Sequence, residues 1–183
     1  MQITFFRAED QATLNSWFSS QLAVTQWAGP GVNWPLSAEF LKTLLDSDRQ
    51  QPASLLTFAG RVEGELAVVA QLGFDWDNHL ACLCRVVVNP GMRGQKLAGK
   101  MLQTLLANAF RQQAIERVEL HVYPFNTAAV RTYEQLGFVR EGVRRHCVVV
   151  GDERWDCALY GMLRTEYAAR STVCISPGSN VLP

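Results

Sequence analysis

The chain has 183 residues, 48% of them hydrophobic and 19% charged, with 17 Lys and Arg against 17 Asp and Glu. This length and composition predict one globular domain, and the balanced charge removes any overall electrostatic reason to bind nucleic acid or an acidic membrane. No apolar run approaches the roughly 20 residues that span a bilayer, and residues 1–10 lack the basic start and apolar core of a secretion signal. We therefore expect a cytoplasmic protein without a nucleic-acid or membrane partner.

Five cysteines and three histidines are spread along the chain without a CxxC pair. The odd number of cysteines and the lack of ligand spacing argue against both a disulfide framework and a metal site. Cys82 and Cys84 lie in the apolar run LACLCRVVV, where a reduced cysteine is typically a small buried side chain. We interpret both as packing residues, in preference to nucleophiles.

The first half of the chain predicts helices followed by an antiparallel β-meander. Apolar residues from Leu14 to Leu22 recur at three- and four-residue steps, which is typical of one helical face. Ser37 is a favourable N-cap for a second helix. The expected strands are residues 3–7, 54–59, 65–74 and 80–88, and the expected helices are residues 12–24 and 39–45.

Two connecting segments carry residues that could contact a substrate. Residues 26–35 contain two prolines, two glycines and two tryptophans, and must end the first helix. We interpret this segment as an apolar lid over the core, in preference to a cleft lined by Trp27 or Trp34. Asp75 and Asp77 could attract a cationic substrate, but aspartate is also common in turns, and the turn is the favoured interpretation.

The second half of the chain alternates helices with strands. After Pro90 the period of the apolar residues changes from two to 3.6, which predicts a helix over residues 97–110. Asn126 and Gly137 are favourable residues for the start and the end of the next helix. The remaining expected elements are strands over residues 118–122, 138–150 and 154–163, and a loosely held tail, residues 167–183, after a single domain of residues 1–166.

Residues 86–100, VVVNPGMRGQKLAGK, are the most informative stretch. A strand leads through a turn directly into a helix, so free backbone N–H groups and the positive end of the helix dipole converge there. Arg93, Lys96 and Lys100 add positive charge, which makes the segment a candidate anion site, above all for phosphate. A tight connection with solvated cations explains the same spacing equally well. The segment matches neither GxxxxGK[ST] nor GxGxxG, which disfavours nucleoside-triphosphate and dinucleotide loops.

Two blocks in this half resemble the signatures of one enzyme superfamily. Residues 93–98, RGQKLA, resemble the signature Q/R-x-x-G-x-G/A, and residues 126–138, NTAAVRTYEQLGF, match N-x-x-A-[IVL]-x-x-Y-x-x-x-G-F at every fixed position. Both are signatures of the GNAT superfamily of acyl-CoA-dependent N-acetyltransferases, and the pattern is most similar to the ribosomal-protein alanine N-acetyltransferases. The order of the expected elements resembles the fold of that superfamily over residues 1–166.

The resemblance implies an α+β fold: a mixed, mostly antiparallel central sheet flanked by helices, with a splayed parallel strand pair that forms an acyl-CoA cleft. The implied co-substrate is acetyl-CoA, with its pyrophosphate on the N–H groups of residues 94–99 and its pantetheine amides on the backbone of residues 86–88. Asn126 is implied to cap its helix and to bind pantetheine. The implied cofactor-binding residues are Val86, Val87, Val88, Arg93, Gly94, Gln95, Lys96, Leu97, Ala98, Gly99, Asn126 and Tyr133.

Lys96 departs from the signature, because it stands where the superfamily has its middle glycine. A glycine there lets the backbone approach a phosphate or adopt a positive φ angle. Lys96 therefore indicates either an ordinary dihedral angle or a looser loop in which its ammonium group contacts phosphate.

Tyr133 and His121 are the expected catalytic residues. Tyr133 belongs to the second signature and, with an ordinary pKa of about 10, can donate a proton to a departing thiolate. The resemblance implies a base at His121, since ribosomal-protein alanine N-acetyltransferases have a glutamate five residues before the asparagine. A histidine that is hydrogen-bonded for structural reasons is an equal alternative, and Glu119, on the same strand face, is the second candidate base.

The leading hypothesis is that the protein transfers an acetyl group from acetyl-CoA to a primary amine by direct attack in a ternary complex, without an acetyl-cysteine intermediate. The alternatives are a noncatalytic acyl-CoA-binding or regulatory module and a nucleotide-binding protein. The tryptophans and aspartates of the two connecting segments suit a cationic amine with an apolar flank, such as a protein N-terminus, a polyamine, an amino sugar or an antibiotic. No metal is implied, and homodimers are common in the superfamily.

Overall fold

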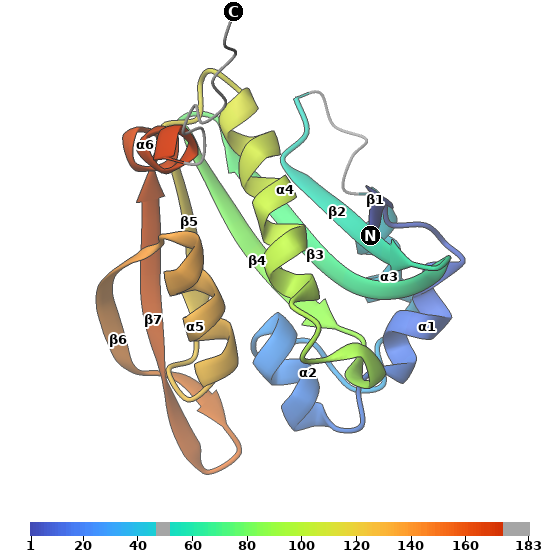
Figure 1. The fold of residues 1–183 in the computed structure, drawn as a ribbon. Helices are drawn as coiled ribbons and strands as arrows, with labels where there is room; N and C mark the ends of the chain where they lie inside the picture. Colours follow the sequence, from blue (N-terminus) through green and yellow to red (C-terminus); the bar gives the residue numbers. More distant parts are fainter. Residues whose placement is uncertain (47–51, 174–183) are drawn as a thin grey trace, which may run out of the picture.

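The computed structural model describes residues 1–46 and 52–173 and contains one seven-stranded sheet with helices on both faces (Figure 1). The strand order across the sheet is β1-β2-β3-β4-β5-β7-β6. No helix in these described ranges is long and apolar enough to cross a membrane. The strands are β1 (Gln2–Phe5), β2 (Leu55–Val62), β3 (Glu65–Asp75), β4 (Leu80–Val88), β5 (Arg117–Val122), β6 (Val139–Val150) and β7 (Glu153–Leu163). The helices are α1 (Asp10–Ser16), α2 (Gln21–Ala28), α3 (Ala38–Asp46), the short 3₁₀ helix η1 (Pro90–Met92), α4 (Leu97–Arg111), α5 (Thr127–Leu136) and α6 (Arg164–Val173).

Neighbouring strands of the sheet are antiparallel except for β4 and β5. Strands β2, β3 and β4 form the predicted meander, and β6 and β7 form the predicted hairpin. The parallel pair β4 and β5 joins the two halves of the chain. This topology confirms the expected α+β fold with a mostly antiparallel sheet and one parallel pair.

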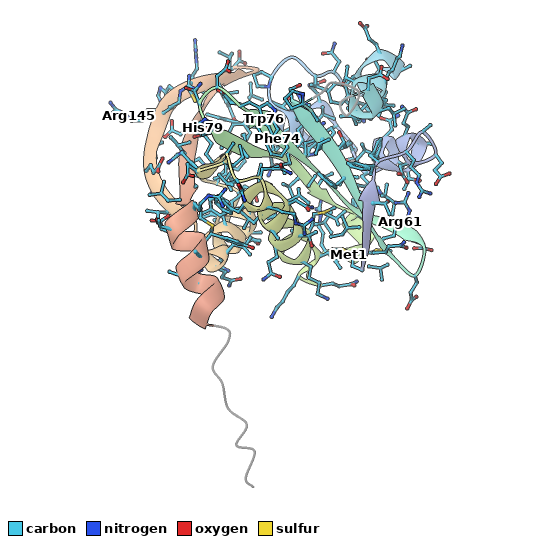
Figure 2. The ribbon with its side chains drawn as sticks, turned by 90° about the horizontal axis from the view of Figure 1, so that it is seen from above. Met1, Arg61, Phe74, Trp76, His79 and Arg145 are labelled. Carbon is cyan, nitrogen blue, oxygen red and sulfur yellow. The ribbon has the colours of Figure 1, made fainter. Side chains whose placement is uncertain are left out.

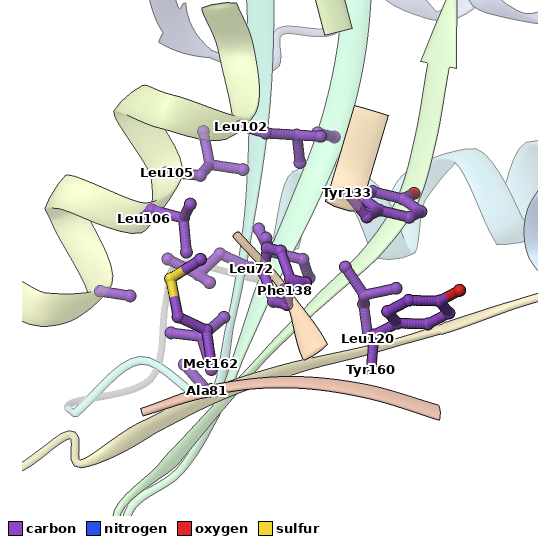
Figure 3. Packing of buried hydrophobic residues seen from close by; sticks show 14 of the residues in the cluster. Leu72, Ala81, Leu102, Leu105, Leu106, Leu120, Tyr133, Phe138, Tyr160 and Met162 are labelled. Atoms are coloured by element: carbon purple, nitrogen blue, oxygen red, sulfur yellow. The ribbon is translucent and has the colours of Figure 1, made fainter. Parts of the chain in front are cut away.

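Helices α4 and α5 cover one face of the sheet and form the larger hydrophobic cluster with it (Figure 3). Leu102, Leu105 and Leu106 project from α4 toward the sheet, where they pack with Leu72 and Ala81. The buried residues of α4 are those of the two apolar rows that the sequence predicts. Because burying one leucine contributes roughly 1.5–3 kcal/mol, this contact fixes α4 against β3 and β4.

Helices α1, α2 and α3 pack on the opposite face and form a second cluster with β2, β3 and β4. Val68 belongs to the first cluster and its neighbour Val69 to the second. Successive side chains of a strand point to opposite faces, so the central strands are covered on both sides. From the second-cluster helices, Leu14, Val24 and Leu44 are buried.

The single helix predicted over residues 12–24 is wrong, because the chain forms two helices there, α1 and α2. The break lies at Ser20, which is extended and whose side chain accepts a hydrogen bond from the Ala23 N–H. This cap satisfies a free donor of the new helix and competes with a continuous helix. Leu22, counted in the predicted apolar face, is 53% exposed.

The segment after α2 folds over the second cluster, as the lid interpretation predicts. The Trp34 Nε1–H donates to the Phe18 carbonyl at 3.0 Å, although the Trp34 side chain is 44% exposed. The Gln21 amide donates to the Val32 carbonyl at 2.8 Å and accepts from the Trp34 N–H at 2.8 Å. Trp27 lies in α2 and packs against Phe18 at a tilt, with ring centroids 4.7 Å apart, so it is part of the core.

The loosely held tail predicted from residue 167 is wrong for residues 167–173, which belong to α6. The Tyr167 ring stacks on Phe110 of α4 with centroids 4.7 Å apart. The Arg164 guanidinium donates to backbone carbonyls at the end of α4, including that of Phe110 at 2.9 Å. These arginine contacts satisfy helix-end carbonyls, and their partners are far away in sequence. Residues 174–183 lie outside the described residues.

The turn between β3 and β4 has a structural role. The Asp75 carboxylate accepts from the Asn78 N–H at 3.0 Å and from its side-chain amide at 2.8 Å, and these hydrogen bonds lower the pKa of Asp75. Phe74 and Trp76 stack with centroids 4.7 Å apart (Figure 2). Figure 2 also shows that this turn is far from Met1 and Arg61 at the β1 edge. The turn interpretation of Asp75 is therefore favoured over a substrate-attracting role.

Candidate active site

Strands β4 and β5 pair only over their first residues and then diverge (Figure 1). The parallel register ends with Leu83 opposite Leu120, whereas β4 stays paired with β3 as far as Val88. The β5-facing backbone edge of residues 86–88 therefore has no strand partner among the described residues. An extended ligand with amide groups can pair with such an edge. This divergence is the splayed pair that the resemblance implies.

The turn after β4 presents backbone donors at the start of α4. Asn89 opens the turn by accepting a hydrogen bond from the Gly91 N–H at 3.0 Å. Gly94 has a φ angle of 81°, and the Lys96 carbonyl accepts from the Lys100 N–H at 3.2 Å, which begins α4. The first N–H groups of a helix have no acceptor within it and lie at the positive end of its dipole. These groups are suited to bind an anion.

The space in front of this turn is open to a ligand. A Cβ atom built on Gly94 or on Gly99 would have no other heavy atom within 4 Å. Gly99 lies in the first turn of α4, where glycine costs roughly 0.5–1 kcal/mol relative to alanine and where its own packing does not require it. Arg93 and Lys96 are exposed beside it. The residues present therefore fit a diphosphate group.

Lys96 adopts the left-handed conformation, with a φ angle of 58° and a ψ angle of 22°. The first of the two alternatives for this residue, an ordinary dihedral angle, is therefore wrong. The left-handed conformation costs a residue with a Cβ atom roughly 1–2 kcal/mol, because the Cβ approaches the next carbonyl oxygen. The backbone thus keeps the shape that a glycine favours, and the ammonium group remains exposed for contact with an anion.

Helix α5 is fixed at both ends as the sequence predicts. The Asn126 Oδ1 accepts a hydrogen bond from the Ala129 N–H at 3.3 Å, and Gly137 ends the helix with a φ angle of 100°. These local interactions fix the first and last turns, and the helix packs on the sheet between them. They place Tyr133 on the buried side of α5.

Tyr133 projects from α5 toward the sheet and is only 8% exposed (Figure 3). Burial, together with the nearby thiols of Cys84 and Cys82, raises the pKa of Tyr133 to about 12. The neighbouring Tyr160 has its hydroxyl bonded to Glu134 Oε1 at 3.1 Å, whereas the Tyr133 hydroxyl has no hydrogen-bond partner among the described residues. Tyr133 is therefore a protonated phenol at neutral pH whose hydroxyl is free to serve a ligand.

His121 lies on β5, exposed on the face opposite the buried Val118 and Leu120. A hydrogen bond with Cys82 is the main cause that raises the pKa of His121 above its ordinary value. The pKa of Cys82 is itself raised, by its hydrogen bond with Cys84 and by burial, so Cys82 is a thiol at neutral pH. The imidazole thus has a defined partner at the divergence of the two strands.

Glu119 is on the predicted strand face but is held in an ion pair. The Arg117 Nε–H donates to Glu119 Oε2 at 3.2 Å, and the same guanidinium donates two hydrogen bonds to Glu141, each at 2.6 Å. The Glu119 carboxylate is thus already engaged by Arg117. The geometry therefore favours His121 over Glu119 as the base.

Arg85 is a site residue that the sequence reasoning missed. It occupies a bulge of β4 with a φ angle of 48°, beside residues 86–88. Its NH1 donates to Gln71 Oε1 at 2.8 Å, and its Cζ lies 5.4 Å from the centroid of the Phe40 ring. The one available signal in the sequence is a single charge inside the apolar run LACLCRVVV.

The structure brings part of the predicted site together. Tyr133, His121 and the two thiols of Cys82 and Cys84 interact electrostatically where β4 and β5 diverge. The anion-binding turn, residues 93–99, lies at the other end of the unpaired edge. A ligand that reaches both places must be long, with an anionic group at one end and a reactive group at the other.

Comparison with known proteins gives the family. The sequence profile described as "Acetyltransferase (GNAT) family" matches residues 20–138, which include both signature blocks. The chain belongs to this family. Members of the family use acetyl-CoA as co-substrate, which has the length and the terminal groups that this site requires.

Two proteins of Bacillus subtilis (strain 168) are similar in sequence, and both are named as uncharacterized N-acetyltransferases. The SPbeta prophage-derived YokL is 33% identical over 75 residues, which are 41% of this chain and 42% of that protein. YnaD is 28% identical over 81 residues, which are 44% of this chain and 48% of that protein. The chain thus spans less than half the length of each of these relatives.

Solved structures are similar over nearly the whole chain. A probable acetyltransferase superposes with a TM-score of 0.75 at 20% identity, covering 90% of this chain and 93% of that one. A Vibrio cholerae spermidine N-acetyltransferase in complex with CoA and spermine superposes with a TM-score of 0.77 at 18% identity, covering 91% of this chain and 97% of that one. A Brucella melitensis ribosomal-protein-alanine N-acetyltransferase superposes with a TM-score of 0.72 at 17% identity, covering 89% of this chain and 99% of that one. At these identities the likeness confirms the GNAT fold.

Replacing Lys96 with glycine should raise the free energy of unfolding by about 0.5–1 kcal/mol. Glycine adopts the left-handed conformation without the Cβ contact, and this relief outweighs the added freedom of the unfolded chain. Urea denaturation measures the change. Gln95→Gly is the matched control, since Gln95 has no positive φ angle and should lose stability. Equal losses in both variants would contradict strain at residue 96.

Replacing Cys82 with alanine should move the titration midpoint of His121 to lower pH, because the hydrogen bond that raises its pKa is lost. NMR titration of the three histidine side chains measures this, with His79 and His146 as internal references. The raised pKa stabilises the folded protein below pH about 6.5, and this contribution disappears as the pH rises through the folded-state pKa. Cys82→Ser, which keeps a hydrogen-bonding group, should shift the midpoint less. An unmoved His121 midpoint in Cys82→Ala rejects the contact.

Proposed function

We propose that the protein is an acyl-CoA-dependent N-acetyltransferase that transfers the acetyl group of acetyl-CoA to a primary amine. The observation that carries the proposal is that the ring of Tyr133 is buried, whereas its hydroxyl has no hydrogen-bond partner among the described residues, at the point where β4 and β5 diverge. A packing tyrosine would be expected to satisfy its hydroxyl within the protein, as Tyr160 does. A proton donor needs this hydroxyl to be free.

The chain has a donor or acceptor for each part of acetyl-CoA. The N–H groups of residues 94–99, with Arg93 and Lys96, would hold the pyrophosphate, as the open space at Gly94 and Gly99 allows. The unpaired backbone of residues 86–88 would pair with the pantetheine amides. Asn126 uses Oδ1 for its cap, and its Nδ2 would donate to pantetheine.

Acetyl transfer to an amine has two proton requirements. An alkylammonium group has a pKa of about 10.4 and a peptide α-ammonium about 7.7–8.0, so the acceptor must lose a proton before its nitrogen attacks. We assign this proton to His121, directly or through water. As the new C–N bond forms and the C–S bond breaks, the CoA thiolate takes a proton from the Tyr133 hydroxyl, and the second proton that the attacking nitrogen loses returns the tyrosinate to the phenol. Tyr133, with its raised pKa, is fully protonated before the reaction.

Most of the rate enhancement is assigned to positioning. Holding an amine against a thioester supplies roughly 7–11 kcal/mol, whereas one proton-transfer group contributes about 10²–10⁴-fold in rate. This difference favours direct attack in a ternary complex. The thiols of Cys82 and Cys84 are then neighbours of the reaction, not acyl carriers.

Replacing Tyr133 with phenylalanine should lower kcat by about 10²–10⁴-fold, with a smaller effect on the KM for acetyl-CoA. Thiol release from acetyl-CoA over a panel of amines measures the rate. Tyr160→Phe is the matched control, because it also removes the hydroxyl of a buried tyrosine and should keep most of the activity. Full activity of Tyr133→Phe would reject its role as the acid. Cofactor binding without turnover of any amine would instead favour the noncatalytic acyl-CoA-binding module.

Replacing Cys84 with alanine should leave most of the turnover in place, because no acetyl-cysteine forms. Mass spectrometry of the wild-type protein mixed with acetyl-CoA alone should find no added acetyl group. When the concentrations of acetyl-CoA and the amine are both varied, double-reciprocal plots of the initial rates should give intersecting lines, as a ternary complex requires. An acetyl group retained on the protein, together with loss of turnover in Cys84→Ala, would replace direct attack with a two-step transfer.

A cytoplasmic location and a homodimeric state are also proposals. The composition supports the first. The family resemblance supports the second. Size-exclusion chromatography with light scattering tests the oligomeric state.

A further inference from the structure

The inference concerns Arg85, and it rests on the proposed function, because it names the class of amine that this site accepts. Arg85 is half-buried on β4, directly before residues 86–88. Its φ angle of 48° results from the bulge of β4 opposite β3. The bulge turns this one charged residue of the strand away from the regular alternation of side chains.

Arg85 differs from the other half-buried arginines by its lack of an acidic partner. Arg61 lies 2.6 Å from Asp10, Arg117 lies 2.6 Å from Glu141, and Arg164 lies 3.5 Å from Glu116. Within residues 1–46 and 52–173, no carboxylate lies within 4.0 Å of Arg85. Burying a charge without a counter-charge is unfavourable, so an unpaired guanidinium in a site is a candidate to bind an anion.

The guanidinium is held in place by neutral groups. Gln71 accepts one of its N–H groups at 2.8 Å, and Gln71 is itself buried and donates to Thr57 Oγ1 at 2.8 Å. The Phe40 ring lies against the guanidinium, with 5.4 Å between Cζ and the ring centroid. These contacts fix the position of the guanidinium but provide no negative charge beside it. Its remaining N–H groups can bind a carboxylate with two hydrogen bonds.

Near Arg85 and Phe40, the indole N–H of Trp27 is a buried donor without an acceptor in the described part of the chain. The Trp27 ring meets Phe40 edge-on with centroids 6.0 Å apart, and its Nε1–H is buried. This N–H has no partner among the described residues. Within the part of the chain that the structure describes, the Phe40 ring is therefore contacted by a guanidinium without a counter-charge and by a tryptophan whose N–H lacks an acceptor.

Arg85 is linked to Tyr133 through its neighbour in the chain, Cys84. Gln71 is opposite Cys84 in the register of β3 and β4, so both side chains are on the sheet face that carries α3, whereas Tyr133 comes from α5 on the other face. The hydrogen bond with Cys82, and then the charge of Arg85, lower the pKa of Cys84. The same thiol helps to raise the pKa of Tyr133. Cys84 is thus within electrostatic reach of both residues.

We propose that Arg85 binds the carboxylate of the acceptor, and that the protein acetylates the amino group of small apolar α-amino acids or close analogues with a carboxylate beside the amine. Phe40 provides the apolar flank. The positive charge of Arg85 opposes a second ammonium group, so polyamines are poor acceptors. The proposed acceptor thus carries a carboxylate beside its amine, unlike the cationic amine that the sequence indicates.

The experiment compares apolar α-amino acids with their decarboxylated amines, for example phenylalanine with phenethylamine and leucine with isopentylamine, and includes spermidine. The wild-type kcat/KM should favour the amino acid of each pair by about 10- to 150-fold, the value of a hydrogen-bonded charge pair. Arg85→Met should bring this ratio close to one. Arg61→Met, which removes another half-buried arginine, should keep it. Turnover that prefers the decarboxylated amines or spermidine would overturn the inference while the proposed function stands.

A binding measurement separates the two proposals if no amine is turned over. Calorimetry with the CoA-loaded protein compares N-acetylphenylalanine with N-acetylphenethylamine. Binding of the carboxylate compound that weakens at least about tenfold in Arg85→Met supports the anion site even without turnover. Equal binding of the two compounds, or no effect of Arg85→Met, overturns it.

Discussion

The candidate site depends on the early end of the parallel pairing between β4 and β5. After Leu83 the backbone of β4 loses its neighbour on one side, and a half-buried strand edge with free amide groups is unfavourable unless something pairs with it. Had the pairing continued to Val88, the edge that we propose for pantetheine would be closed. The same divergence leaves room for side chains from both faces of the sheet, Tyr133 from one and His121 from the other.

Packing on the two faces keeps the strands in this arrangement. Helix α4 is fixed to β3 and β4 by its buried leucines, and α5 brings Tyr133 and its neighbours onto the β5 half of the same cluster. Helices α1, α2 and α3 cover the central strands from the other side and bring Phe40 against Arg85. Each half of the sheet has its own helix contacts, so the divergence of β4 and β5 requires no loss of core.

The shared fold does not by itself decide which amine is accepted. The similar solved structures superpose over most of the chain at 17% to 20% identity, and the fold is common to proteins with different acceptors in their names. The difference must lie in side chains around the divergence. Arg85 sits at a bulge, where a local change of backbone direction turns one side chain without disturbing the rest of the strand. A change of acceptor at such a position has little effect on the core.

The sequence by itself determined what depends on local interactions. The apolar rows of α4, the Asn126 cap and Gly137 end of α5, the meander and both family signatures follow from residue spacing, and the fold class follows from them. Tertiary structure alone decided the docking of α6 through Arg164, the left-handed Lys96, the contact of His121 with Cys82, and the Arg85 contacts. These features join residues from different elements or impose a backbone angle against local preference, so no periodicity in the chain records them.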